Sequence, residues 1–317
     1  MSASGVSAAT PLVDRALAAF ADQVGTEGAV TAVGGQTQWD VGGLPHPSAR
    51  LVRPPAGVVA HQPEEMIVRV RAGTTVAELD AVLAEAGQMV PLDPAQPARA
   101  TVGGVLSIGH SGLRRLRWGP ARDYLLEARY VSAQGRLIKA GGPVVKNVSG
   151  FDLCRLLVGS LGTLGLLGEV VLRVQPRPAA WRWLHSEEAD PFSVVPRLYR
   201  PSSVLWDGRA TWVLLEGHPA DVEDQAGVLG PAFEPATGPP EVLEAGRRSV
   251  RPSALPTVAA SLRPGTFLAE LGVGVVHLAD DHALPPDNPQ PSTVDLNQRV
   301  KDSFDPTGRL NPGRRVA

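Results

Sequence analysis

The chain has 317 residues, of which 43% are hydrophobic and 20% charged, and 30 Lys and Arg nearly balance 32 Asp and Glu. This length allows two domains with sizeable cores, and the charge balance argues against the basic face of a nucleic-acid-binding protein. The single cysteine, Cys154, excludes an internal disulfide framework and a cysteine-ligated zinc or iron–sulfur site. We expect Cys154 to be a small buried side chain rather than a catalytic thiol.

The first 178 residues alternate predicted helices and strands. The clearest helix follows Thr75, because Glu78 completes a capping box three residues later and Gly87 supplies a stop. A hairpin is predicted around Gln134-Gly135. The other elements expected here are helices at 12–24 and 153–158 and strands at 30–33, 51–52, 58–60, 66–70 and 170–174.

Two prolines, Pro176 and Pro178, predict a domain boundary, and the pattern beyond them is weaker. An exposed linker is expected where Pro and Asp accumulate, and Asp305-Pro306 ends the last helix. The predicted elements are strands at 211–215 and 274–278, a helix at 221–229, the linker at 283–291 and a helix at 294–304.

Four glycine-bearing loops are the candidates for an anion-binding site. Glycine permits positive φ, so that backbone N–H groups can converge on one anion. Taken singly, each loop is more simply explained as a turn. Neither a Rossmann G-x-G-x-x-G nor a P-loop motif is present. The loops are 33–38, 100–104 continuing to 109–112, 146–152 and 159–165, with hydroxyl donors at Thr37, Thr101, Ser111 and Thr163 and balancing charges at Arg117 and Arg122.

Histidines and arginines supply the candidates for catalysis. His110 lies in the second glycine loop and His277 at a predicted strand end, and a structural or surface role is the alternative for both. A substrate carboxylate needs an arginine, for which Arg114, Arg115 and Arg117 are candidates. The catalytic residues otherwise stay unassigned.

The order of the motifs resembles the FAD-binding, PCMH-type oxidoreductases of the vanillyl-alcohol oxidase group, and within it the FAD-binding (E) subunits of glycolate oxidases. The resemblance implies an α+β fold. A two-lobed PCMH-type FAD-binding domain (1–178) would be followed by a smaller α+β cap or substrate domain (179–291) and a C-terminal segment (292–317) that returns to the flavin. The matching motifs are Gly34-Gly35-Gln36-Thr37, Ala100-Thr101-Val102-Gly103-Gly104, Arg117-Trp118-Gly119 with Arg122-Asp123, residues 146–152, residues 156–165 with Glu169, and residues 304–313.

The resemblance also implies the cofactor-binding residues. The first loop would wrap the FAD pyrophosphate with backbone N–H groups, the second would lie along the flavin and phosphates, and the fourth would hold the ribityl or adenine side. Asn311 would approach the flavin ring. The implied set is Gly34, Gly35, Gln36, Thr37, Gln38, Thr101, Gly103, Gly104, Ser111, Gly112, Gly162, Thr163, Glu169, Val170 and Asn311.

Departures from the family pattern sharpen these expectations. Gln36 stands where covalent members often have histidine, so FAD is expected to be bound without a covalent link, and attachment through His110 is not expected. Phe151 stands where members of the family usually have a tyrosine. The metal motif of the larger glycolate oxidase subunit is reduced to residues 272–277, so no metal is predicted.

The resemblance implies FAD-dependent oxidation of a small 2-hydroxy acid, such as glycolate or D-lactate, by hydride transfer to flavin. His110, Arg117 and His277 are the candidate catalytic residues. A second flavin subunit and an iron–sulfur subunit are the expected partners. A non-catalytic flavin-binding structural subunit and a flavin-free binding module remain alternatives. With neither a signal peptide pattern nor a membrane span, the protein is expected to be cytoplasmic.

Overall fold

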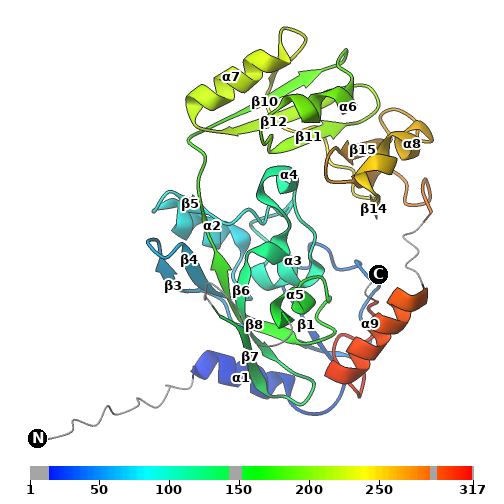
Figure 1. The fold of residues 1–317 in the computed structure, drawn as a ribbon. Coiled ribbons are helices and arrows are strands. Elements are labelled where there is room, and N and C mark those ends of the chain that lie inside the picture. The colour runs from blue at the N-terminus through cyan, green and yellow to red at the C-terminus, as the bar shows by residue number, and fades with distance from the viewer. Residues whose placement is uncertain (1–13, 143–151, 286–290, 316–317) are drawn as a thin grey trace, which may run out of the picture.

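The computed structural model describes residues 14–142, 152–285 and 291–315. Within these residues the chain forms an N-terminal lobe around a five-stranded sheet, followed by a seven-stranded sheet (Figure 1). Both sheets are antiparallel and both carry helices, so the expected α+β class is confirmed. No helix of the described residues is long and apolar enough to cross a membrane.

The N-terminal sheet has β8 at its centre, and seven of the eight β8 residues are buried. One face carries the apolar side chains of Val68, Val70, Ala128 and Val170, which belong to the main core of this lobe. The opposite face carries ion pairs and is crossed by α1 (Arg15–Val24). In order across the sheet, the strands are β3 (Val58–Gln62), β4 (Ile67–Arg71), β8 (Leu166–Arg173), β6 (Leu125–Val131) and β7 (Leu137–Gly141).

Local signals account for several elements of this lobe. Both bonds of the capping box form, since Glu78 N donates to Thr75 Oγ1 at 3.2 Å and Thr75 N donates to Glu78 Oε2 at 2.9 Å. The predicted hairpin pairs β6 with β7, and Gly135 adopts φ +72° in its turn. The helices are α2 (Val76–Ala84), α3 (Val102–Ile108), α4 (Arg115–Trp118), the 3₁₀ helix η1 (Ala121–Asp123) and α5 (Leu153–Leu157).

Residues 102–104 were expected to lie in a glycine loop, and this expectation is wrong, because they begin the helix α3. Glycine disfavours helices because of its backbone entropy, but here it allows close packing. A Cβ on Gly103 would lie 2.7 Å from the Ala72 Cβ. The Thr101 hydroxyl caps the helix by accepting a hydrogen bond from Gly104 N at 3.2 Å. Tertiary packing therefore overrides helix propensity.

The C-terminal segment returns to the N-terminal lobe. Leu310 forms a parallel bridge with Val30, and Asn311 N donates to the Val30 carbonyl at 2.8 Å. This pairing extends the short parallel sheet that leads into the first glycine loop. The elements involved are β1 (Val30–Ala32), β2 (Arg50–Val52) and α9 (Pro291–Phe304); a second small sheet pairs β5 (Gln88–Met89) with β9 (Gln175–Pro176).

The C-terminal sheet presents two different faces. One is apolar, carries Leu184, Val213, Leu215 and Val276, and belongs to a core that includes residues of α6, α7 and α8. In order across this sheet, the strands are β13 (Glu234–Ala236), β10 (Ala180–Ser186), β12 (Thr211–Gly217), β11 (Ser203–Trp206), β15 (Phe267–Glu270), β16 (Val275–Leu278) and β14 (Gly246–Ser249). The helices of this part of the chain are α6 (Pro191–Val194), η2 (Val195–Arg197), α7 (Pro219–Leu229), η3 (Pro252–Ala254) and α8 (Leu255–Ala260).

Candidate cofactor-binding site and lobe junction

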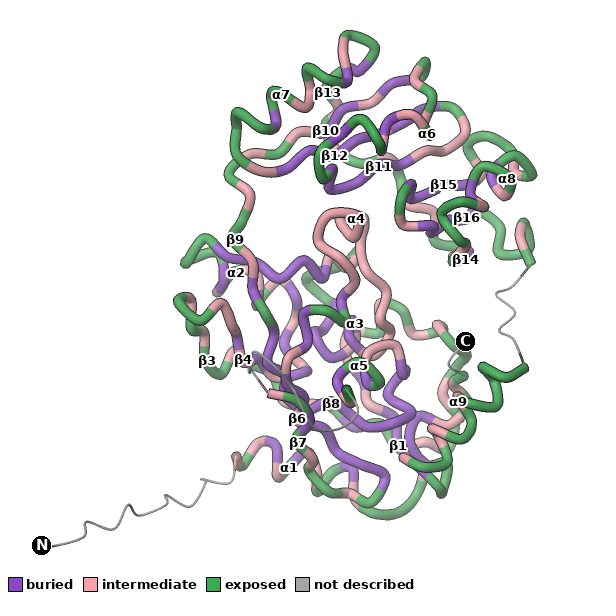
Figure 2. The backbone as a smooth tube through the Cα atoms, viewed as in Figure 1, coloured by how far each residue is buried: buried purple, intermediate pink, exposed green. Residues whose placement is uncertain are grey.

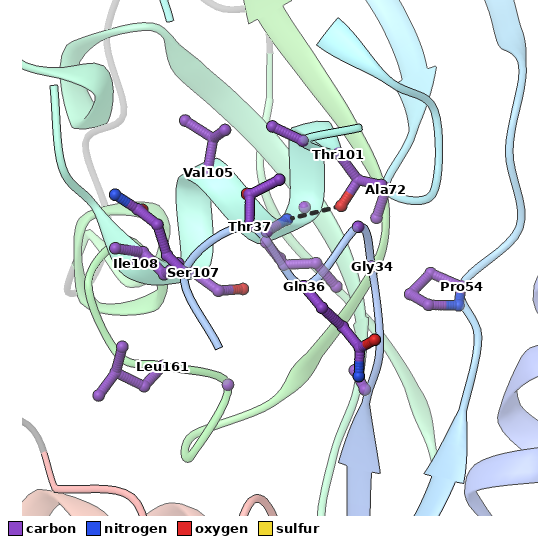
Figure 3. Close-up of a pocket in the computed structure, with 18 of the residues that line it drawn as sticks. Gly34, Gln36, Thr37, Pro54, Ala72, Thr101, Val105, Ser107, Ile108 and Leu161 are labelled. Atoms are coloured by element: carbon purple, nitrogen blue, oxygen red, sulfur yellow. Dashed lines mark hydrogen bonds between the residues drawn. The ribbon is translucent and has the colours of Figure 1, made fainter. Parts of the chain in front are cut away.

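A pocket opens in the N-terminal lobe where the first glycine loop, α3, the fourth glycine loop and the C-terminal segment meet (Figure 3). In the close-up, Gln36 and Thr37 lie near the helix residue Val105, with Leu161 on one side and Pro54 on the other. The lining consists of Ala32, Gly34, Gly35, Gln36, Thr37, Gln38, Trp39, Pro54, Ala72, Pro94, Ala100, Thr101, Gly103, Gly104, Val105, Ser107, Ile108, Leu161, Gly162, Leu166, Leu167, Asn311 and Arg314.

The first glycine loop offers a row of unused backbone donors. None of the N–H groups of residues 34–38 donates a hydrogen bond to another group of the described chain. Gln36 takes the left-handed φ of +57° that non-glycine residues rarely adopt. Backbone N–H groups in such a bend form a concavity suited to an anion. The partners of these donors are therefore solvent or a ligand.

This loop packs tightly on the start of α3. A Cβ on Gly34 would overlap the Thr101 hydroxyl, and a Cβ on Gly35 would overlap the Arg99 carbonyl oxygen. Glycine is required here because protein backbone approaches protein backbone. The two loops predicted to share a ligand are thus in direct contact.

The α3 wall of the pocket presents one helix face. Gly104, Ser107 and Ile108 are three and four residues apart, so they lie on the same side of the helix. Their neighbours Val102 and Gly103 donate their backbone N–H groups to Thr74 and Ala72 carbonyls. This wall therefore contributes small and apolar surface and the Ser107 hydroxyl rather than free backbone amides.

The fourth glycine loop and the C-terminal segment close the pocket. Leu161 (φ +54°), Gly162 (φ +70°) and Asn311 (φ +45°) all have left-handed backbone conformations. Asn311 Nδ2 donates to the Leu161 carbonyl at 2.5 Å, while its Oδ1 is buried and has no partner among the described residues. Leu161 N in turn donates to the Ser107 carbonyl at 2.7 Å. Strained backbone of this kind concentrates at functional sites.

Two charged side chains hold the C-terminal segment in place. The buried Arg309 guanidinium donates to the carbonyls of Val24, Gly25, Glu27, Gly28 and Ala133. Burial lowers the pKa of Arg309. In a separate contact, the α9 side chain Lys301 donates to the carbonyls of Thr163 and Leu310 and pairs with the Asp305 carboxylate at 2.5 Å. These contacts keep Asn311 beside the fourth loop.

Positive charge in the pocket comes from the C-terminal segment. Arg314 is the charged residue of the lining, and it donates to the carbonyls of Trp39 and Val41 at 2.7 Å. Its guanidinium also lies 5.0 Å from the centroid of the Trp39 ring, and its Nε has no partner among the described residues. Arg117, expected to balance phosphate charge, instead donates to the Arg200 and Glu216 carbonyls, and neither it nor Arg122 lines the pocket.

Ten of the fifteen expected cofactor-binding residues line this pocket, and five do not. Ser111 accepts a hydrogen bond from Ala121 N, and Gly112 packs on Asp93. Thr163 donates its hydroxyl to the Ser160 carbonyl, and Val170 is a core residue. Glu169 pairs with Arg69 at 3.0 Å on the far face of the sheet. Residues 146–151 of the third glycine loop, which include Phe151, lie outside the described residues.

Several lining residues were missed by sequence analysis. Ser107 and Ile108 follow Gly104 at helical spacing, so recognising α3 as a helix would have found them. Leu161 lies within the fourth glycine loop that the sequence singled out, whereas Trp39 and Arg314 carry no such signal, because their positions depend on packing between distant segments.

The catalytic candidates gather at the junction between the lobe and the C-terminal sheet. Arg114 pairs with Asp93 at 2.5 Å and with Glu216 at 3.2 Å, and the Trp118 indole donates to Glu216 at 3.0 Å. His277 lies 2.8 Å from Glu270 Oε1. Burial, reinforced by the nearby charges of Arg247 and His277, lowers the pKa of His110 to about 4. His110 and His277 are thus brought near each other from distant parts of the sequence.

Among the described residues, neither the pocket nor the junction has a cluster of side chains that could bind a metal ion. No group of three or more His, Cys, Asp and Glu side chains that could hold a metal ion occurs in the described ranges 14–142, 152–285 and 291–315.

Comparison with known protein families identifies the class of the N-terminal lobe. Residues 16–141 match the FAD binding domain family, and this part of the chain is an FAD-binding domain of the PCMH type. The chain is similar to glycolate oxidase subunit GlcE of Escherichia coli, with 36% identity over 186 residues, covering 56% of this chain and 53% of that protein.

Other relatives match shorter stretches. Glycolate oxidase subunit GlcD of Bacillus subtilis is 36% identical over 36% of this chain, and D-lactate dehydrogenase of Archaeoglobus fulgidus is 40% identical over 33% of it. The matches span about half the length of GlcE and 24% of the other two proteins. The chain is therefore related to FAD-linked oxidoreductases of the glycolate oxidase and D-lactate dehydrogenase type.

Solved structures show the same fold. Two structures of alkyldihydroxyacetonephosphate synthase match with TM-scores of 0.64 and 0.66 at 15% and 14% identity. Each match covers 90% of this chain and 71% of the synthase chain. The likeness therefore extends beyond the FAD-binding domain to the C-terminal sheet.

Proposed function

We propose that this chain is an FAD-dependent oxidoreductase that oxidises a small 2-hydroxy acid, such as glycolate or D-lactate, and holds FAD without a covalent link. The observation that carries the proposal is the row of unpaired N–H groups at residues 34–38, set against a wall built by α3, the fourth glycine loop and Asn311. A diphosphate needs several donors around two charged groups, and a bend of this kind provides them.

The pocket residues fit the parts of the dinucleotide. The first loop would hold the pyrophosphate, with Arg314 as the nearby cation. The face of Gly104, Ser107 and Ile108 leaves room for a flat or extended group, because its side chains are small or apolar. The buried Asn311 Oδ1 offers an acceptor to a donor of the cofactor. An unpaired buried acceptor is costly, so a bound partner would stabilise this arrangement.

The side chains near the pocket also favour non-covalent binding. Gln36 has no nucleophilic atom, and His110 lies outside the lining. Cys154 is buried, its thiol contacts the Leu126 and Ala140 carbonyls, and burial raises its pKa to about 11. A thiol in this state is a poor nucleophile.

In this proposal the bound flavin supplies the two-electron acceptor, and the protein binds and orients the acid and removes its hydroxyl proton. The C-terminal sheet meets the lobe at the junction where Glu216 of β12 contacts Arg114 and Trp118. His110, Arg117 and His277 all lie there, and Arg117 already donates to the carbonyls of Glu216 in β12 and of Arg200 in the loop before β11. The two histidines are therefore the better candidates to move a proton.

The proposal divides the chain into an FAD-binding domain (1–178), a substrate or cap domain (179–291) and a C-terminal segment (292–317). The start of the C-terminal sheet at Ala180 and the return of Leu310 to Val30 support this division. We also propose that the protein works in a multisubunit complex with a second flavin subunit and an iron–sulfur subunit in the cytoplasm, since GlcE and GlcD are named as glycolate oxidase subunits.

The absorbance spectrum of the purified protein tests the cofactor. Flavin bands that pass into the supernatant after acid precipitation are expected, and a colourless protein that takes up no added FAD would overturn the proposal. Anaerobic addition of glycolate or D-lactate then tests the activity. Bleaching of the flavin supports the enzyme, whereas a yellow protein that neither acid reduces, alone or with its partner subunits, supports a structural flavin-binding subunit.

A further inference from the structure

A chain of ion pairs runs from the wall of the cofactor pocket to the C-terminal sheet. It begins at Asp93, the residue before Pro94, which lines the pocket. Arg114 donates to both oxygens of Asp93, from Nε to Oδ2 at 2.9 Å and from Nη2 to Oδ1 at 2.5 Å. Its other amino group, Nη1, donates to Glu216 Oε1 of β12 at 3.2 Å. One guanidinium therefore joins a carboxylate of the lobe to a carboxylate of the sheet.

The lobe end of this chain is held in one geometry. Asp93 adopts a left-handed φ of +44°, which non-glycine residues rarely take, so the surrounding contacts must fix it. A Cβ on Gly112 would overlap Asp93, because the second glycine loop packs directly on this bend. Two parallel hydrogen bonds between a guanidinium and a carboxylate also fix the orientation of both groups. A movement of Arg114 therefore acts on the backbone beside Pro94.

The sheet end of the chain depends on groups of the lobe. The Glu216 side chain is only 7% exposed, and both its oxygens accept hydrogen bonds, from Arg114 and from Trp118 Nε1 at 3.0 Å. Among the described residues, no group of the sheet itself donates to this carboxylate. Taking a carboxylate out of water is costly unless such partners are present. The sheet can therefore bury Glu216 only while it is docked on the lobe.

Apolar contacts of the same lobe segment, residues 113–118, accompany these hydrogen bonds. Leu113 packs on the apolar cluster that includes Leu268 of β15. The turn between β15 and β16 touches α4, since a Cβ on Gly272 would lie 2.8 Å from the Leu116 side chain. Figure 1 shows α4 projecting from the lobe toward β11 and β15. One short segment thus carries both polar and apolar docking contacts.

Two walls of the pocket lead into this junction. Pro94 is joined to it through the ion pair of the preceding residue. Ile108, the last residue of α3, also lines the pocket and is followed by the loop that leads to Arg114. Residues 107–120 are all half-buried, and Figure 2 shows this stretch as the part of the lobe nearest the C-terminal sheet. The shape of the pocket and the docking of the sheet therefore depend on the same few residues.

We propose that Asp93, Arg114 and Glu216 couple FAD binding to docking of the C-terminal sheet, so that each stabilises the other. The inference rests on the proposed function, for which it names how the cofactor pocket is regulated. Arg114, a candidate ligand for a substrate carboxylate, is then a positioning residue. Such coupling is reciprocal: if the docked sheet tightens FAD binding, bound FAD favours docking by the same factor.

The environment of the ion pairs gives the direction of the coupling. In the docked state Arg114 is 24% exposed and lies between two carboxylates, and an ion pair is stronger where water is excluded. Separation of the sheet exposes the pair of Arg114 with Asp93 to water and weakens it. The bend beside Pro94 then loses its fixed shape. FAD affinity falls with the fraction of molecules that hold the binding-competent shape.

Glu216→Gln tests the coupling, because it removes the charge and keeps the size of the side chain. The dissociation constant of FAD, measured by flavin fluorescence on the full-length chain, should rise at least about fivefold. Asp93→Asn should raise it at least as much. The matched control, Glu234→Gln, changes an exposed carboxylate on β13 of the same sheet and should leave FAD binding unchanged. Equal constants in Glu216→Gln and the wild-type chain overturn the coupling.

The double variant distinguishes coupling from two local effects. If Asp93 and Glu216 act through Arg114 as one unit, the double variant should bind FAD no more weakly than the weaker of the two single variants. Changes in the dissociation constant that multiply would overturn the coupling. If Glu216→Gln fails to fold, Arg114→Lys replaces it, since lysine keeps the charge but lacks the planar fork. An unchanged FAD affinity in Arg114→Lys would also overturn the coupling.

Amide hydrogen exchange measures the reciprocal effect. In the wild-type chain, saturating FAD should slow exchange in residues 113–118 and in β12. In Glu216→Gln, also saturated with FAD, this slowing should be lost. A merely structural role of Glu216 would instead change exchange equally with and without FAD.

The two proposals fail in different ways. A yellow protein in which FAD leaves exchange at the junction unchanged overturns the coupling and keeps the flavin proposal intact. A colourless protein that takes up no added FAD overturns the proposed function, and the coupling with it.

Discussion

The pocket and the lobe junction are built from different materials. The pocket depends on backbone groups, close-packed glycines and three non-glycine residues with left-handed φ, whereas the junction depends on the charged side chains of two lobes. A site built from backbone groups is lost when the backbone shifts, but it depends on the identity of few side chains. A site made of side chains can lose its chemistry through one substitution while the fold persists.

The largest expected effect comes from the wall that the C-terminal segment adds to the pocket. Arg309→Met would leave the carbonyls of Val24, Gly25, Glu27, Gly28 and Ala133 without their shared donor. We expect the free energy of unfolding to fall by about 3 kcal/mol or more. Urea denaturation measures it.

Arg299→Met is the matched control, because Arg299 is exposed on the same segment and pairs with an equally exposed Asp295. Its effect should stay within about 0.5 kcal/mol. Equal losses in the two variants would mean that Arg309 does not hold the segment.

A substitution in the first glycine loop is expected to act next most strongly. Gly35→Ala forces a methyl group into the Arg99 carbonyl, so the loop must shift and its amides with it. We expect at least a tenfold rise in the dissociation constant of FAD and a loss of about 1–3 kcal/mol in stability. Flavin fluorescence measures the first and thermal unfolding the second.

Gly227→Ala provides the comparison, since a Cβ there meets no atom within 4 Å. This change inside α7 should leave FAD affinity unaltered and raise stability slightly, as alanine favours helices. Unchanged FAD binding in Gly35→Ala would contradict the role of the loop.

Asn311 tests whether a side chain contributes to the pocket at all. Asn311→Asp removes the donor to the Leu161 carbonyl and turns a carboxylate toward it. FAD binding should weaken about tenfold, corresponding to about 1.4 kcal/mol. Asn297→Asp on α9 is the control, and an equal response in both variants would remove the special role of Asn311.

The smallest effect at neutral pH belongs to His110. Its pKa of about 4 lies below the unfolded value of 6.5, so the unfolded chain binds more protons between these two pH values. Its contribution to stability is therefore complete above pH 6.5 and is lost as the pH falls toward 4. His110→Asn should flatten this part of the stability profile, and an unchanged slope would mean that His110 is not held neutral by its surroundings.

The sequence by itself determined the elements with strong local signals. The Thr75 capping box, the hairpin at Gly135 and the alternation of the early strands depend on neighbouring residues, so they could be predicted. The motif order also indicated the flavin-binding class, and the family match over residues 16–141 confirms it. Ten of the fifteen expected site residues accordingly line one pocket.

Tertiary structure decided the rest. It made α3 a helix in spite of Gly103 and Gly104, and it placed Glu169 in an ion pair on the far face of the sheet. It also set Asn311 against Leu161, and His110 near His277, across more than a hundred residues. Such contacts depend on how separate segments pack and on which face each strand turns inward, and neither is encoded in the spacing of nearby residues.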